Sequence, residues 1–112
     1  MHQNPEEKAL LDAVRSEVTD LTRRVAPDGW GELREALAAW VNDLILHDFQ
    51  ELVRILYRID VNENKLKFLL KEKVGEDTPQ IIADLIIERQ VQKIKTRQQF
   101  RQPPPEDEED KW

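Results

Sequence analysis

The stretch that decides the fold is 78-TPQIIADLIIER-89, which would be apolar on nearly every side as a helix. Thr78 and Pro79 provide an N-cap residue and a first-turn proline, and proline suits that position because its missing N–H is not needed there. The isoleucines alone would also suit a strand, but Asp84 and the Thr-Pro start favour a helix. A helix that is apolar all round is buried by other helices. We therefore expect this segment to lie at the centre of a helical bundle.

Upstream of that segment, apolar residues recur at three- and four-residue steps, which is the period of an α-helix. They predict a first helix from residue 5 to about residue 25, with an apolar stripe at Leu10, Leu11, Val14, Val18, Leu21 and Val25. The turn residues APDG at 26–29 end that helix. A second helix is expected over residues 31–46, with an inner face at Leu33, Leu37, Trp40, Val41, Leu44 and Ile45.

Two tetrapeptides, DFQE at 48–51 and DVNE at 60–63, have the spacing of a capping box with an acid in place of the hydroxyl. The first predicts a break near His47 and Asp48; one continuous helix over residues 31–59 is the alternative. The third helix should carry Phe49, Leu52, Val53, Leu56 and Tyr57. The fourth, opened by Asp60 and closed by the Val74-Gly75 pair, should carry Leu66, Phe68, Leu69 and Leu70.

Composition supports an all-α fold, since 36% of the 112 residues are charged and only three are glycine. We expect a compact bundle of four to five helices in a single domain at 1–102, followed by a flexible, disordered acidic tail at 103–112. No apolar run approaches the roughly 20 residues that span a bilayer, and the N-terminus lacks the pattern of a signal peptide. The absence of cysteine fits a reducing compartment, so a cytoplasmic protein without a membrane partner is expected.

Candidate catalytic groups are sparse. Asp43, His47 and Glu51 would align for a metal only if residues 31–59 formed one helix, and the expected break makes His47 a solvated helix-end residue instead. No phosphate-binding loop, dinucleotide fingerprint, nucleophile elbow or Glu-x-x-His pair is present. We therefore expect a protein that is not an enzyme, with no metal, no cofactor and no small-molecule substrate.

Three aromatic residues lie at informative positions. Trp30, in a tight interhelical turn, is either a partner anchor or, more commonly, a side chain that folds back to close the end of a helical hairpin. Trp40 lies on the apolar face of the second helix and is expected in the core. Tyr57 should sit near a helix end with its hydroxyl group reaching a polar partner.

The segment 89-RQVQKIKTRQQFR-101 is the leading candidate for an interaction surface. The fifth helix should be about 33 Å long, longer than the bundle requires, so its basic end is expected to project. Such an end is a solvated face, a surface for a protein or a second copy, or a site for nucleic-acid phosphates. The predicted partner contacts are Lys93, Lys95, Arg97, Arg101 and Trp112.

The last stretch, 102-QPPPEDEEDKW-112, combines three prolines, five consecutive acids and a terminal tryptophan. Four accounts fit it: a docking peptide for a partner's basic groove, a segment that folds back on its own basic helix, a segment that binds a neighbouring copy, or a solubilising tail. If the tail folds back, its acidic residues can reach Arg97 or Arg101, but they can reach Arg89 only if the chain reverses sharply.

The function expected from the sequence is therefore that of a non-catalytic protein-interaction module, a small adaptor or accessory subunit. Its surfaces would be the projecting basic helix end and the acidic, Trp-terminated tail. The alternative is a nucleic-acid-binding protein whose basic helix, residues 89–101, is masked by that tail.

Overall fold

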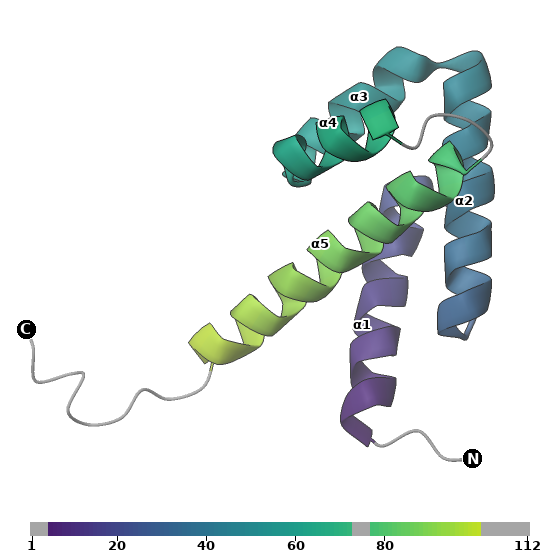
Figure 1. Cartoon of the computed structure of the whole chain (residues 1–112). Helices are drawn as coiled ribbons and strands as arrows, with labels where there is room; N and C mark the ends of the chain where they lie inside the picture. Colours follow the sequence, from purple (N-terminus) through teal and green to yellow (C-terminus); the bar gives the residue numbers. More distant parts are fainter. Residues whose placement is uncertain (1–4, 73–76, 102–112) are drawn as a thin grey trace, which may run out of the picture.

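The computed structural model describes residues 5–72 and 77–101, apart from the side chains of residues 69, 70, 72 and 99–101. These residues form five α-helices and no strand: α1 (Pro5–Thr22), α2 (Trp30–His47), α3 (Phe49–Arg58), α4 (Glu63–Glu72) and α5 (Thr78–Arg101) (Figure 1). The predicted all-α bundle is confirmed. Among the described helices, none combines the length and the apolar character that a membrane crossing needs.

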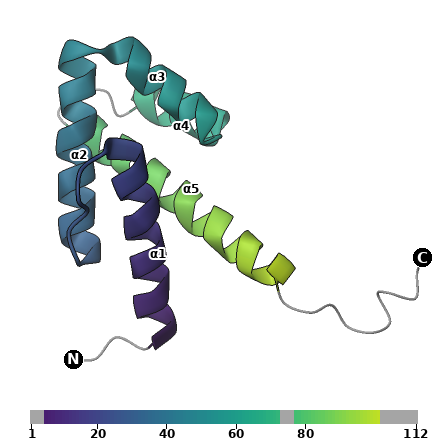
Figure 2. The same cartoon turned by 180° about the vertical axis from the view of Figure 1, so that it is seen from behind.

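Helix α5 is the central element, as its sequence predicts. It runs diagonally across α1 and α2 and lies beside α4, an arrangement that both views show (Figures 1 and 2). The side chains that face these neighbours are buried: Ile82, Ala83, Leu85, Ile86 and Ile94. Burial on several sides is what an apolar helix of this kind requires.

Ion pairs at the edge of the core connect α5 to α2 and α4. Arg34 of α2 holds Asp84 through two hydrogen bonds, of 2.6 Å and 3.1 Å. The hydrogen bond to Asp84, and then its charge, raise the pKa of the exposed Arg34 above its ordinary value. Lys65 of α4 lies 3.0 Å from the carboxylate of Glu88. Both acids of the first half of α5 are therefore paired with bases on other helices.

The predicted inner faces of α1 and α2 form the rest of the core, which includes Leu11, Val14, Val18, Leu33, Leu37, Trp40 and Val41. Trp30 is partly buried and packs against the same core, so the commoner of its two interpretations is correct. The sequence placed Val25 on the α1 stripe, and that prediction is wrong: Val25 is 87% exposed. The helix ends at Thr22, and Arg23 turns the chain with a φ of 61°.

The turn after α1 is held by side chains of that helix. The Arg15 guanidinium group donates to the carbonyl oxygens of Ala26 and Pro27, each at 2.9 Å. The Thr19 hydroxyl oxygen accepts from the amide of Ala26 at 3.1 Å. These bonds pull Ala26 into the core while the neighbouring Val25 points outward.

The predicted break between the second and third helices is confirmed, and the alternative of one continuous helix over 31–59 is wrong. Asp48 leaves the helical conformation, and its side chain accepts a hydrogen bond from the Glu51 amide at 3.2 Å. That bond is the first half of the predicted capping box. The chain therefore changes direction at one residue.

The start of the fourth helix requires a correction. The cap is Asn62, whose Oδ1 accepts from the Lys65 amide at 2.9 Å, and not Asp60. Asp60 has a φ of 65° and ends α3 instead; Asn and Asp tolerate this left-handed conformation better than most residues. Similarly, the first helical hydrogen bond of α5 joins Ile81 to Asp77, one residue before Thr78. The predicted stop at Val74-Gly75 and the tail at 103–112 lie outside the described residues.

Candidate binding groove between α3 and α4

An apolar groove lies between α3 and α4, with α5 at its floor. It encloses a cavity of ≈170 Å³. Its walls are Phe49, Leu52, Val53, Leu56, Tyr57, Val61, Glu63, Leu66 and Lys67, and Ile82 of α5 closes the bottom. We call this feature the α3–α4 groove.

The groove arises because α3 is apolar over a wider arc than one neighbour can cover. Ile55 and Ile59 are buried, and α3 packs chiefly on α2. Phe49 and Tyr57 are 56% and 65% exposed. Helix α4 packs on α5 rather than on α3, so the two short helices stand apart and leave apolar side chains between them.

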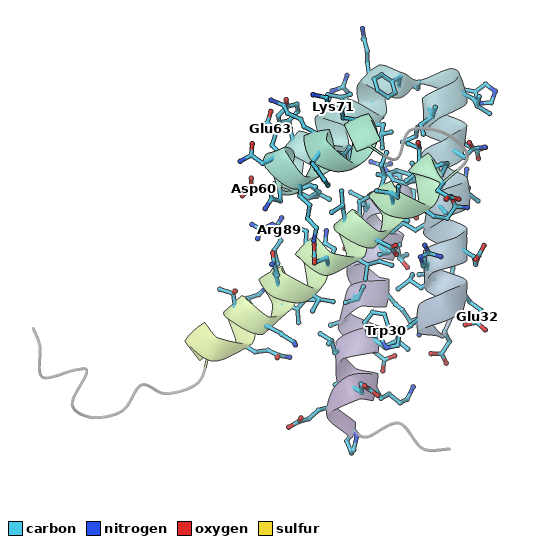
Figure 3. All side chains as sticks on the ribbon, viewed as in Figure 1. Trp30, Glu32, Asp60, Glu63, Lys71 and Arg89 are labelled. Carbon is cyan, nitrogen blue, oxygen red and sulfur yellow. The ribbon has the colours of Figure 1, made fainter. Side chains whose placement is uncertain are left out.

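Three polar groups meet at the edge of the α3–α4 groove. The Tyr57 hydroxyl group donates to Glu63 Oε2 at 3.1 Å. Lys67 Nζ lies 3.6 Å from the same Glu63 oxygen. Lys71, one turn further along α4, is exposed and forms no ion pair with any described residue; Figure 3 labels Glu63 and Lys71 on this helix. The groove is thus apolar inside, with a carboxylate and basic side chains along α4.

A second, polar hollow of ≈300 Å³ adjoins the groove and shares Tyr57, Val61 and Glu63 with it. Its far wall is Arg89 and Gln92 of α5. Arg89 donates to the Ile59 carbonyl oxygen at 3.1 Å and lies 3.3 Å from Asp60 (Figure 3). The polar hollow therefore extends the groove towards the C-terminal half of α5.

The structure separates the basic residues that the sequence grouped together. Arg97 lies 3.6 Å from Glu17 of α1, and Ile94 is buried. Helix α5 is therefore buried as far as Ile94, and the exposed Arg97 side chain reaches across to α1, while the C-terminal end of α5 points away from α1 (Figure 1). Lys93 is half-buried and Lys95 is exposed; neither forms an ion pair with a described residue. The Arg101 side chain and Trp112 lie outside the described residues.

The candidate metal alignment at the end of α2 does not form. His47 is the last residue of α2, and its Nδ1 lies 3.0 Å from the Asp43 carbonyl oxygen. The break at Asp48 carries Glu51 onto α3. Across residues 5–72 and 77–101, no group of three His, Cys, Asp or Glu side chains is arranged to hold a metal ion.

The sequence contained a signal for the α3–α4 groove that helix assignment alone does not use. The ten residues of α3 include six large apolar or aromatic side chains, FQELVRILYR, in a helix of under three turns. A short helix so rich in apolar residues exposes some of them unless two neighbours cover it. Phe49 and Tyr57 are the two that stay exposed.

Comparison with protein-family models, with curated proteins and with solved structures yields no match to this chain. What the chain does is therefore inferred from the contacts of its own residues.

Proposed function

We propose that the chain is a non-catalytic protein-interaction module that binds its partner in the α3–α4 groove. The observation that carries this proposal is the exposure of Phe49 and Tyr57 on the wall of an apolar groove. Exposed apolar patches on a small protein mark binding surfaces, and tyrosine is enriched among the residues that dominate binding energy.

The size of the groove supports a protein ligand over a small-molecule substrate. Its cavity of ≈170 Å³ is below the roughly 300–1,000 Å³ of sites that enclose a drug-sized ligand. A cavity of this size suits one or two bulky side chains from an extended or helical segment.

Charge along α4 specifies the partner further. Lys67 lines the groove and pairs with Glu63 at 3.6 Å, and Lys71 follows it by one turn on α4 without an ion pair to a described residue. Acidic residues flanking the apolar anchor would be attracted chiefly to Lys71, and they would compete with Glu63 for Lys67. The fitting partner is an acidic segment with a bulky apolar or aromatic anchor. Lys93, Lys95, Arg97 and Arg101 stay predicted partner contacts of the same module.

Nucleic-acid binding by residues 89–101 is supported less well. Arg89 and Arg97 already pair with Asp60 and Glu17, so a phosphate would compete with a carboxylate for two of the five positive charges. Exposed pairs of this kind are weak, however, so the experiment should separate the two functions.

Affinity capture from source-cell lysate with three full-length proteins tests the proposal. The wild type is compared with Val53→Glu, which places a charge in the groove wall, and with Val25→Glu. Val25 lies in the α1–α2 loop, is 87% exposed, and provides the same chemical change away from the groove. Circular dichroism checks that all three proteins are folded.

We expect a protein partner that the wild type and Val25→Glu both capture, that Val53→Glu loses, and that survives nuclease treatment. Equal capture by all three proteins would overturn the groove as the binding surface. Capture that nuclease abolishes and Val53→Glu leaves unchanged would assign the function to the basic helix.

A further inference from the structure

The chain carries a segment whose chemistry matches the partner that the α3–α4 groove fits. Resting on the proposed function of that groove, we propose that residues 102–112 of the same chain occupy it in the free protein, with Trp112 as the anchor. A partner must then displace this segment to bind.

The first argument is chemical complementarity. Trp112 is preceded by Lys111 and by five acids at 106–110, which makes the segment acidic with an aromatic anchor. The indole ring needs an apolar pocket and an acceptor for its one N–H group. Glu63 provides the acceptor at the groove edge: it receives the Tyr57 hydroxyl group, and a carboxylate can accept several further hydrogen bonds.

The second argument is the path between the end of α5 and the groove. Both views place the C-terminal end of α5 on the same side of the molecule as the ends of α3 and α4 that meet there (Figures 1 and 2). The polar hollow lies between them; Arg89 and Gln92 of α5 line one side, and Asp60, Asn62 and Glu63 line the other. Lys93 follows Arg89 by four residues and so shares its side of α5. The acids would therefore run past Lys93, which has no ion pair with a described residue, and would compete with Asp60 for Arg89 and with Glu63 for Lys67.

The third argument is length. Twelve residues separate Arg89 from Arg101, which is about 18 Å of helix. If the chain reverses at the three prolines, residues 106–112 still span about 23 Å when extended. Trp112 can therefore return to the level of Arg89, where the polar hollow opens into the groove. The short connection to α5 also gives residues 102–112 an effective concentration at the groove in the mM range. This favours binding of the chain's own segment over that of a second copy.

Nuclear magnetic resonance on the full-length protein tests this contact directly. The three tryptophans give three indole N–H signals, and Trp112→Ala identifies the signal of Trp112. We expect Val53→Glu to shift that signal to its position in a synthetic peptide of residues 102–112, and Val25→Glu to leave it unchanged. We also expect Trp112→Ala to move the amide signals of Val53 and Lys67.

Two results would overturn the proposal. In the first, the Trp112 signal of the wild type already coincides with that of the peptide. In the second, its shift grows with protein concentration, which would mean that the segment comes from a second copy.

The lysate capture separates this proposal from the proposed function. If the segment masks the groove, Trp112→Ala captures several-fold more partner than the wild type, because more of the protein is competent to bind. Groove-dependent capture with a free Trp112 would overturn the tail contact and leave the function intact. A docked Trp112 without any groove-dependent capture would overturn the function instead.

Discussion

The hydroxyl group of Tyr57 donates to Glu63 at 3.1 Å, a bond that joins the end of α3 to the start of α4 across the edge of the groove. Between them the chain turns at Asp60, whose left-handed backbone ends α3. The same tyrosine ring forms part of the groove wall. Tyr57 therefore serves two roles that substitutions can separate.

Tyr57→Phe removes the hydrogen bond and keeps the ring, whereas Tyr57→Ala removes both. Since the bond is exposed, we expect Tyr57→Phe to change stability by no more than about 0.5 kcal/mol and to preserve partner binding. Truncating an aromatic side chain that contacts the partner often costs about 1 kcal/mol or more of binding free energy, so Tyr57→Ala should bind markedly more weakly in a titration. An equal loss of partner affinity in Tyr57→Phe and Tyr57→Ala would assign the effect to the hydroxyl group.

The Asp48 cap separates α2 from α3, and its loss should destabilise the bundle. Asp48→Ala removes the acceptor for the Glu51 amide, and losing such a cap costs about 1 kcal/mol. Asp48→Asn is the matched control because asparagine caps equally well. Urea unfolding followed by circular dichroism measures the free energy of unfolding of both variants. If Asp48→Ala has the same unfolding midpoint as Asp48→Asn, the side-chain cap contributes little.

Gln90 is a polar residue in the middle of the α5 core. It is 3% exposed, and its side-chain oxygen has no donor among the described residues. A buried acceptor without a partner costs about 1–3 kcal/mol, so Gln90→Met, which keeps a similar unbranched shape, should stabilise the fold by about 1 kcal/mol.

The exposed Gln92→Met serves as the control for Gln90→Met and should leave stability nearly unchanged. Thermal and urea unfolding measure the stability of the two variants relative to the wild type. A lower stability of Gln90→Met would show that the amide has a favourable partner that offsets its burial.

Replacing each of two leucines of α2 by alanine tests which face of this helix lies in the core. Leu37 is 1% exposed and Leu46 is 67% exposed. Leu37→Ala should lower the free energy of unfolding by about 2–5 kcal/mol, because it leaves a cavity. Leu46→Ala should change it by about 0.5 kcal/mol or less. Similar losses in the two variants would contradict the arrangement of α2 described above.

The helices were predictable from the sequence because each rests on local signals. Apolar periodicity located α1 and α2, the Thr78-Pro79 start and Asp84 indicated α5, and the DFQE spacing located the break at Asp48. The errors came where local signals compete. Val25 fits the period of α1, but the bonds from Arg15 and Thr19 to the next turn end the helix first. Asp60 and Asn62 are both good caps, and the left-handed turn at Asp60 leaves the cap to Asn62.

The candidate site was less predictable because it depends on how two short helices diverge. The sequence showed that Phe49 and Tyr57 share a face, but not that α4 would pack on α5 and leave that face open. Similarly, nothing local to Arg97 indicates Glu17, which lies 80 residues earlier in the chain. Pairing over such distances is decided by the packing of whole helices rather than by neighbouring residues.

The central position of α5 also has a consequence during synthesis of the chain on the ribosome. About 56 residues separate the end of α1 from the start of α5, which at 5–20 residues per second takes roughly 3–11 s. During that interval the apolar face around Leu11, and then the face around Leu37 once α2 has been made, lack the helix that buries them. The nascent bundle should therefore be a substrate for chaperones that hold exposed apolar segments, and it should be released from them only once residues 82–94 emerge.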